Sequence, residues 1–424
     1  MMYTRNMSNK TLVDLDQWLA PHKSIIQARE KYISSKLKTV LSGKTPAEFA
    51  MGFLHFGLHK TDTGWAFREW APNATRMFLV GDFSGWKERE EFALSRDKNG
   101  EWSINLPEDS LRHGQKYKLR VHWSDGDGWR LPSYANYVIQ DENSVDFSAV
   151  VWSPKTPYDW QYKTPPKPKV PLIYEAHVGM SSQKEKVASF SEFTAEVLPR
   201  IKESGYNTIQ LMAIAEHPYY GSFGYHVSNF FAVSSRFGTP DDFKKLVDAA
   251  HGIGLRVIID LVHAHAAKNE VEGLGNFAGD PTQYFKPTNH PEWDSRLFDY
   301  GKPEVLHFLA SNCRWWLDEY HIDGFRFDGV TSMIYHDHGL GKSFTSYDDY
   351  FRDDVDKDVL TYLRLANETI HAVRPDATTI AEEMSGFPGL GASIKDGGLG
   401  FDYRLQMGAP DLWIKTLKEK NDED

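Results

Sequence analysis

From about Pro171 onward, the sequence alternates short runs of Ile, Val and Leu with longer amphipathic stretches. Each short run has the length of a strand, and each longer stretch places its apolar residues at helical spacing. Strands that are apolar along their whole length are buried on both faces, as in a parallel sheet covered by helices. This alternation limits the possible folds more than any other feature, and it predicts a series of β/α units.

Five strands and a possible sixth can be placed in this region. We predict them at residues 172–178, 208–212, 256–262, 321–328, 377–382 and 401–405. Helices are predicted from the Thr239-Pro240-Asp241 start, from Pro303 to Tyr320, and over residues 359–373. Because the units follow one another without reversal, and no Gly-x-Gly-x-x-Gly follows the first strand, a (β/α)8 barrel is favoured over an open dinucleotide-binding sheet. Such a barrel has eight strands, so it is incomplete in this chain.

The region before Pro171 has a different pattern. Residues 14–41 predict a helix ended by Gly43 and Pro46, with one apolar face formed by Trp18, Ile25, Ile26, Tyr32 and Ile33. Short alternating strands separated by Gly, Asn and Asp then predict a β-sandwich, in which one of Trp65 and Trp70 belongs to the core. The predicted domains are a helical segment (1–46), the sandwich (47–152), a proline-rich linker (153–170) and the barrel (171–424).

Composition excludes several classes of protein. A net charge of −11 argues against a nucleic-acid or anionic-membrane partner. Cys313 has apolar neighbours at helical spacing, so we place it in the core. It is the single cysteine of the sequence, which excludes intramolecular disulfides. Residues 1–10 are polar and no run of eighteen apolar residues occurs, so the sequence predicts a cytoplasmic protein without a leader or membrane span.

Charged residues gather where the predicted strands end. In β/α barrels the reactive residues lie at the carboxyl ends of the strands. Alternation along residues 324–328 places Arg326 and Asp328 on one face of the strand, and Phe325 and Phe327 on the other. The residues at the three strand ends are Asp260, His263 and His265, then Arg326 and Asp328, then Glu382 and Glu383.

Two carboxyls from neighbouring strands suit cleavage of a glycosidic bond, in which one attacks the anomeric carbon and the other protonates the leaving oxygen. We expect Asp328 to be the nucleophile, because a cation such as Arg326 lowers a nearby carboxyl pKa by about 1–3 units. Glu382 follows apolar residues, and partial desolvation would keep it protonated as the general acid. The alternative is a set of structural ion pairs.

Asp260, His263 and His265 could also be interpreted as a metal site. Their spacing matches no common zinc motif and no cysteine supports it. We therefore expect Asp260 and His265 to hydrogen-bond sugar hydroxyls, and we expect neither a metal nor a cofactor. Trp86, in the turn-rich segment Gly81-Asp-Phe-Ser-Gly-Trp86, is a candidate contact to a glucan.

These segments resemble a known family. Asp260-Leu-Val-His-Ala-His265, Gly324-Phe-Arg-Phe-Asp328 and Ala381-Glu382 are similar to the first three of the four sequence regions that define the α-amylase family. Tyr219-Tyr-Gly-Ser-Phe-Gly-Tyr225 and Gly400-Phe-Asp-Tyr-Arg404 resemble its glycogen- and starch-branching enzymes of eukaryotic type. Phe67-Arg-Glu-Trp-Ala-Pro72 resembles the carbohydrate-binding module that precedes such barrels.

The resemblance implies a role for each matched residue. Asp328 would be the nucleophile and Glu382 the general acid/base. Tyr225 would stack under the sugar at the bond being cut, and Asp260, His265 and Arg326 would contact it. Two departures are notable: Glu383 and Met384 stand where relatives usually have Asp and Val, and Ala264 replaces a calcium-ligating Asn, so calcium is not implied.

The implied activity is 1,4-α-glucan branching: retaining cleavage of an α-1,4 link and transfer of the chain to a 6-hydroxyl of glycogen, amylose or amylopectin. Two alternatives stay open, an α-glucan hydrolase of amylase or debranching type and a non-catalytic glucan-binding fragment. The sequence stops at Asp424, before the family's fourth region with its His-Asp pair and third carboxylate. We therefore expect a truncated chain that is inactive and prone to aggregate alone, from a protein that is a monomer when complete.

Overall fold

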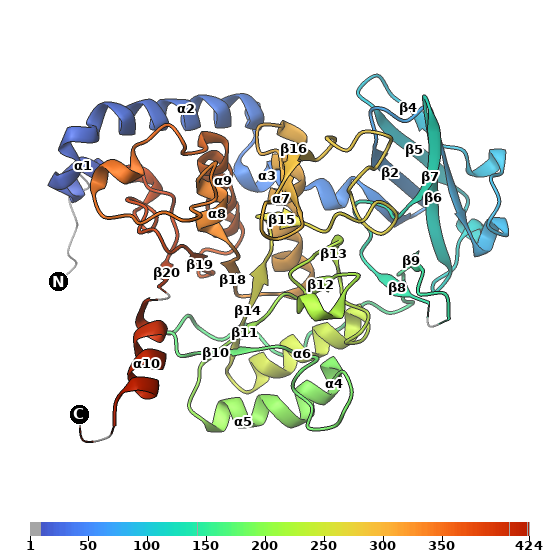
Figure 1. The fold of residues 1–424 in the computed structure, drawn as a ribbon. Coiled ribbons are helices and arrows are strands. Elements are labelled where there is room, and N and C mark those ends of the chain that lie inside the picture. Colours follow the sequence, from blue (N-terminus) through green and yellow to red (C-terminus); the bar gives the residue numbers. More distant parts are fainter. Residues whose placement is uncertain (1–9, 142, 407, 422, 424) are drawn as a thin grey trace, which may run out of the picture. The chain divides into compact units, whose positions relative to one another are not determined.

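The computed structural model describes residues 10–141, 143–406, 408–421 and 423. The polar N-terminus through Asn9, for which the sequence predicts no leader, lies outside them, as do parts of the tail. The chain divides into a larger unit, Lys44–Gly324 with Thr369–Ala377, and a smaller unit, Met1–Gly43 with Phe325–Glu368 and Thr378–Asp424. Figure 1 shows the ribbon of both. Over the described residues, no helix combines the length and apolar character needed to cross a membrane.

The larger unit begins with the predicted β-sandwich, built from two antiparallel sheets (Figure 1). Trp65 is buried within it, whereas Trp70 is half-buried with its ring 5.5 Å from that of Tyr284, which confirms that one of the two tryptophans belongs to the core. One sheet has the order β1 (Gly57–Thr61), β2 (Gly64–Trp70), β5 (Glu101–Leu106), β4 (Ser95–Arg96). The other has the order β3 (Arg76–Gly81), β6 (Lys116–Trp123), β9 (Phe147–Val150), β8 (Val138–Gln140), with β7 (Gly126–Arg130) also on β6.

The same unit holds the first parallel strands. β10 (Ile173–Ala176), β11 (Thr208–Leu211) and β14 (Arg256–Leu261) are adjacent and parallel in that order. Their connections contain α4 (Phe190–Glu192), a π-helical turn (Phe193–Val197), α5 (Leu198–Glu203) and α6 (Pro240–Gly252), and α7 (Pro303–Tyr320) follows with Cys313 fully buried. Small antiparallel pairings in the loops, which the sequence did not predict, involve β12 (Ala215–Glu216), β13 (Asn229–Val233), β15 (His265–Ala266), β16 (Phe285–Asn289) and β17 (Arg296–Phe298).

The start of α6 shows why the sequence marks it so clearly. The Thr239 hydroxyl accepts a hydrogen bond from the Asp242 backbone N–H at 3.2 Å, and the Asp242 carboxylate accepts one from the Thr239 N–H at 3.1 Å. Pro240 occupies the first helical position, where no backbone donor is needed. The predicted helix start is confirmed.

In the smaller unit, β18 (Gly324–Phe327, which starts at the end of the larger unit), β19 (Thr378–Glu382) and β20 (Tyr403–Leu405) are neighbours in that order. They are joined through α8 (Val330–Ile334) and α9 (Lys357–Val373), and α10 (Gly408–Glu419) follows. Among the described residues, each unit therefore contributes three strands of the barrel sheet. A complete barrel has eight such strands.

The N-terminal segment corrects one prediction. Instead of one helix it forms α1 (Leu12–Leu15), a 3-10 helix (Gln17–His22) and α2 (Lys23–Leu41). Pro21 lies in the 3-10 stretch, whose three-residue turn changes the direction in which Trp18 points. Trp18 is 76% exposed and Ile25 is 38% exposed, so the single apolar face is wrong at these two positions, while Ile33 is buried.

Helix α2 lies beside α9 in the smaller unit (Figure 1), and side-chain polar contacts join the two helices. The Arg364 guanidinium donates to both carboxylate oxygens of Glu30, at 2.8 and 2.6 Å. The Tyr32 hydroxyl donates to Asp358 at 2.7 Å. A bidentate guanidinium–carboxylate pair is both strong and directional, so the predicted N-terminal helical segment is anchored to a barrel helix.

One buried carboxylate organises the amino-terminal side of the parallel strands in the larger unit. Asp323 accepts hydrogen bonds from the Val257 N–H at 2.7 Å, from His251 Nε2 at 2.8 Å and from Arg374 Nη1 at 2.9 Å. Its side chain is fully buried, as is that of His251. This carboxylate therefore links β14, α6 and the segment after α9.

Replacing Asp323 with Ala should lower the free energy of unfolding by about 3–5 kcal/mol, because the change leaves buried donors without their acceptor. Denaturant titration followed by tryptophan fluorescence measures the effect. Asp62→Ala, in the exposed turn between β1 and β2, is the control and should change stability by less than about 0.5 kcal/mol. Equal losses in the two variants would contradict the central role of Asp323.

Candidate active site

Two carboxylates of the smaller unit share one cation. Asp328 directly follows β18, and Glu382 is the last residue of β19. Arg326 Nη1 lies 2.9 Å from Asp328 Oδ1, and Arg326 Nη2 lies 3.0 Å from Glu382 Oε2. Arg326 is 7% exposed, and such contacts are stronger in a low-dielectric interior than in water. The structure thus brings together three of the four residues that the sequence assigned to these strand ends.

The apolar residues of β18 take the opposite face, as strand alternation predicts. Phe325 and Phe327 are fully buried, and the Phe327 ring lies 5.2 Å from that of Phe401 in an edge-on arrangement. This packing confirms the predicted division of β18 into a charged face and an aromatic face. It fixes the strand whose other face carries Arg326.

The residue after the predicted nucleophile also contacts the second carboxylate. The Gly329 backbone N–H donates to Glu382 Oε2 at 2.8 Å. Gly329 has φ of 61°, in the left-handed region that a side chain makes costly. A glycine is therefore required where the chain turns to direct this N–H at Glu382.

The pKa of Asp328 corrects the sequence-based prediction. Burial raises the pKa of this carboxyl above its ordinary value, although the Arg326 guanidinium acts to lower it. The prediction counted the neighbouring cation but not the loss of solvent, and was wrong in direction. It also assigned Arg326 to Asp328 alone, because a contact from β18 to Glu382 on the next strand leaves no trace in sequence spacing.

The side chain of Glu383 accepts hydrogen bonds from the loop that follows it. Its buried carboxylate accepts hydrogen bonds from the backbone N–H groups of Ser385 (2.8 Å), Gly386 (2.9 Å) and Phe387 (3.1 Å), and Arg404 lies 3.5 Å away. Of the two adjacent glutamates, Glu382 is therefore the one directed at Arg326. The sequence could not reveal this structural role of Glu383, because nothing in the sequence distinguishes the two orientations.

A second cluster, in the larger unit, surrounds Asp260 at the end of β14. This side chain is buried, and its two oxygens accept hydrogen bonds from Gln210 Nε2 at 2.8 Å and from the Tyr225 hydroxyl at 2.6 Å. Gln210 also donates to Glu175 at 3.2 Å. The sequence analysis missed Gln210, although a glutamine between Ile209 and Leu211 in the buried strand β11 was a usable signal.

His265 joins this cluster through the main chain. Its Nε2 lies 2.8 Å from the Tyr225 carbonyl oxygen, which can only accept, so the proton is on Nε2 and Nδ1 is an acceptor. Nδ1 is buried and has no hydrogen-bond partner within the described part of the chain. Burial lowers the pKa of His265 to about 4, which leaves a neutral ring. This atom is suited to accept a hydrogen bond from a ligand hydroxyl.

The loop that carries Tyr225 is shaped by the residue before it. Gly224 has φ of 92°, and a Cβ atom there would lie 2.0 Å from the Ala213 carbonyl oxygen. Phe223 is also left-handed, with φ of 54°. Only glycine fits this close approach, so Gly224 fixes the position from which Tyr225 reaches Asp260.

His263 does not join Asp260 and His265. Its Nε2 lies 2.9 Å from Asn312 Oδ1 on α7, and burial lowers the pKa of its ring to about 4. His263 lies beyond the end of β14 at Leu261, and its ring is directed at α7 instead of Asp260. The His263 side chain belongs to the packing of α7.

Trp86, the candidate glucan contact in the sandwich, is 37% exposed with φ of 60°. Its Nε1 donates to Asp82 Oδ1 at 3.0 Å, and its ring lies 6.4 Å from that of Trp129 on β7. The guanidinium of Arg120 lies 5.3 Å from the centre of the Trp129 ring. The sequence analysis missed Trp129, which supplies a half-buried aromatic ring beside the exposed Trp86.

Comparisons with known proteins agree with this arrangement. Residues 55–135 match carbohydrate-binding module 48 (isoamylase N-terminal domain), and residues 194–273 match the α-amylase catalytic domain. The chain is 48% identical to a 1,4-α-glucan-branching enzyme of Solanum tuberosum over 98% of its length, 47% identical to one of Yarrowia lipolytica over 96%, and 45% identical to one of Dictyostelium discoideum over 100%. It spans 50%, 62% and 63% of those three relatives, respectively.

Solved structures show the same fold at low sequence identity. Pullulanase from Bacillus acidopullulyticus has a TM-score of 0.61 and 20% identity, covering 77% of this chain and 41% of the other. The catalytic module of the glycogen-degrading pneumococcal virulence factor SpuA has a TM-score of 0.60 and 18% identity, covering 77% and 50%. At these identities both likenesses concern the fold alone.

The raised pKa of Asp328 predicts a pH-dependent stability. Between the carboxyl pKa of the unfolded chain, about 4, and the raised folded value, the folded chain holds a proton that the unfolded chain releases. Asp328 therefore reduces stability as pH rises through this window, and Asp328→Asn removes that effect. The melting temperature of the variant minus that of the original chain should become more positive from pH 4 to pH 7.

Asp376→Asn is the control of opposite sign. Hydrogen bonding to Arg256 lowers the pKa of Asp376 despite its partial burial, so its contribution to stability is lost as pH falls. The melting-temperature difference for this variant should become more negative from pH 4 to pH 7. The same trend in both variants would contradict the assignment for Asp328.

Proposed function

We propose that this chain, which belongs to the α-amylase family in its group of 1,4-α-glucan-branching enzymes, carries the residues that cleave an α-1,4 link and transfer the released chain to a 6-hydroxyl. The observation that carries the proposal is the pair of carboxylates, Asp328 and Glu382, bound to the two ends of one guanidinium. Two carboxyls held together at strand ends are the machinery of glycosidic-bond cleavage, and their separation decides between retention and inversion.

In the proposed mechanism, Asp328 attacks the anomeric carbon while Glu382 protonates the departing 4-oxygen, giving a glycosyl ester on Asp328. Glu382, now a carboxylate, accepts the proton of an incoming 6-hydroxyl, whose oxygen displaces Asp328 from the anomeric carbon. Two inversions retain the α configuration. This route requires the two carboxyl groups to be about 5–5.5 Å apart, which stays a prediction.

We assign sugar binding to Asp260, His265, Tyr225 and Arg326. His265 Nδ1 would accept a hydrogen bond from a sugar hydroxyl, because the ring is neutral and Nε2 is committed to the Tyr225 carbonyl. The Tyr225 ring would stack on the sugar while its hydroxyl stays on Asp260. These donors are fixed before substrate arrives, which limits the reorganisation needed at the transition state.

The same residues would serve hydrolysis, with water in place of the 6-hydroxyl, and a glucan-binding fragment would need none of this chemistry. Iodine staining of amylose combined with a reducing-end assay separates the three. Branching changes the stain with almost no new reducing ends, hydrolysis creates many, and a binding protein changes neither. The identity to branching enzymes over nearly the whole chain supports the first outcome.

In an active full-length form of the protein, Glu382→Gln should lower transfer or hydrolysis by about 10²–10⁴-fold, the usual contribution of general acid–base catalysis. Affinity for maltoheptaose should stay largely unchanged, because the amide keeps the size and shape of the carboxyl group. Glu196→Gln, on an exposed face of the larger unit, is the matched control and should keep full activity. Undiminished activity in the Glu382 variant would exclude it as the general acid.

For the sandwich, we propose that Trp86 and Trp129 form a glucan-binding surface. Trp86→Ala in the whole chain should reduce retardation on a native gel that contains glycogen. Trp413→Ala, which removes a tryptophan that is 68% exposed on α10, is the control for loss of an aromatic side chain. Equal migration of the two variants would exclude Trp86 from glucan binding.

The remaining proposals concern the setting of the protein. A neutral polysaccharide fits a chain of net charge −11, and nucleic acid does not. We propose a cytoplasmic location, consistent with a single, buried cysteine, and a monomeric protein.

A further inference from the structure

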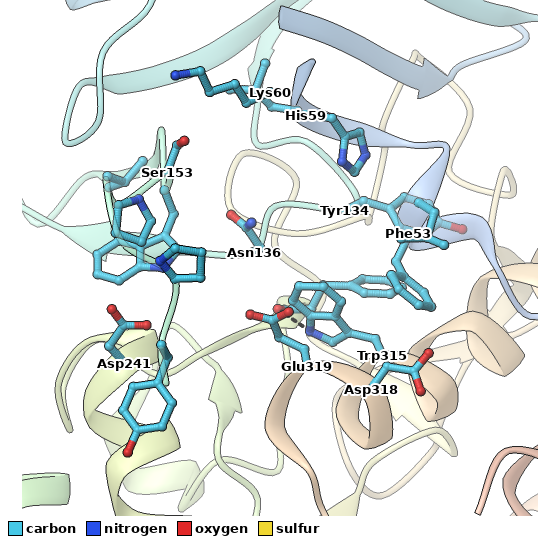
Figure 2. Close-up of a pocket in the computed structure, with 18 of the residues that line it drawn as sticks. Phe53, His59, Lys60, Tyr134, Asn136, Ser153, Asp241, Trp315, Asp318 and Glu319 are labelled. Carbon is cyan, nitrogen blue, oxygen red and sulfur yellow. Dashed lines mark hydrogen bonds between the residues drawn. The ribbon is translucent and has the colours of Figure 1, made fainter. Parts of the chain in front are cut away.

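A large cleft lies in the larger unit, lined by none of the residues assigned to catalysis or sugar binding (Figure 2). Its volume is about 540 Å³, within the range of small-ligand sites. The sandwich and the 3-10 turn Gly52–Leu54 form one side, the proline-rich linker forms another, and α6 and α7 form the floor.

Aromatic side chains gather around this cleft. Four of the thirteen tryptophans of the chain line it: Trp65, Trp152, Trp160 and Trp315. Except for the buried Trp65, these rings are half-buried, so part of each ring is open to solvent. The aromatic residues, 14% of the chain, are therefore partly concentrated at one place outside the candidate active site.

The rings are held in place by their own contacts. Trp315 Nε1 donates to the Phe231 carbonyl oxygen at 2.9 Å, and its ring lies 5.4 Å from that of Phe53. The Trp160 ring stacks on His321, with centroids 3.9 Å apart and an 18° angle between the planes. Pro154 and Pro157 stiffen the linker that carries Trp160. Little ordering is needed on binding, which favours affinity.

Polar groups are interspersed among the rings. Asp241 and Glu319 lie on the helical side of the cleft, and His59 and Lys60 lie on the sandwich side, with Asn136 between them (Figure 2). Lys244 pairs with Glu319 and lies 3.9 Å from Asp241. Asp241 Oδ1 is buried and accepts no hydrogen bond from any residue that the structure describes.

This lining selects a neutral, hydroxyl-rich ligand. The carboxylates disfavour an anion. Lys244 pairs with Asp241 and Glu319, and Arg314 pairs with Asp318 at 2.8 Å, so no strongly negative centre is left to attract a cation. Hydroxyl groups can donate to Asp241 and Glu319, while the apolar face of a sugar ring packs on tryptophan. We propose that the cleft binds a segment of α-glucan at a site separate from the catalytic carboxylates, an inference that rests on the proposed function only for the identity of the sugar.

The test measures binding of maltoheptaose to the whole chain by calorimetry and by hydrogen exchange. Maltoheptaose should protect peptides containing residues 152–160 and 315–319 from exchange. Trp160→Ala should abolish this protection and weaken that binding about tenfold, equivalent to 1.4 kcal/mol. Trp160→Phe, which keeps an aromatic face, should restore most of it, and Trp413→Ala should have no effect.

Protection that is unchanged in Trp160→Ala, or absent from the original chain, would overturn the proposal. Protection by an apolar Leu/Trp peptide but not by maltoheptaose would overturn it in favour of a peptide site. If Trp160→Ala disturbs folding, Glu319→Gln, a carboxylate change at the floor of the cleft, gives the same test. If maltoheptaose protects the cleft peptides from exchange but the iodine assay shows no branching, only the proposed branching activity is contradicted. If the assay shows branching but the cleft peptides are not protected, only the proposed glucan site in the cleft is contradicted.

Discussion

The candidate active site depends on one buried guanidinium that two carboxylates share. Removing Arg326 from water is costly unless its donors are met, and Asp328 and Glu382 meet two of them. The same contacts hold the two acids beside each other on adjacent strands. Phe325 and Phe327 fix the strand from its other face, and Gly329 supplies a further donor to Glu382. The position of the two proposed catalytic carboxyls therefore follows from the need to pair the buried Arg326 guanidinium.

The cluster around Asp260 follows the same logic in the other unit. Both carboxylate oxygens are engaged by side-chain donors, Gln210 and Tyr225, which leaves the ring of His265 with an acceptor atom for a ligand. In each cluster a carboxylate at a strand end is oriented by a polar residue from a neighbouring strand or loop. Such preorganisation is achieved by folding, before any sugar is bound.

Much of this could be predicted from the sequence, because two periodicities are strong in it. Apolar runs located the parallel strands, and alternation placed Arg326 and Asp328 on one face of β18. Contacts between elements could not be predicted: the link from Arg326 to Glu382, the burial that raises the pKa of Asp328, and the pairing of Trp86 with Trp129 all join segments distant in sequence. The helical face with Trp18 failed because a 3-10 turn containing Pro21 changes the period.

The length of the Glu383 side chain is matched to the path of the loop that follows β19. Its carboxylate caps three successive backbone N–H groups, from Ser385 to Phe387, next to the proposed general acid. The aspartate usual at this position in the resembled family is one methylene shorter, so it would reach the same donors only if the loop lay closer to β19. The length of this side chain and the path of the loop after β19 therefore depend on each other, and a shorter acid would need a different main-chain path.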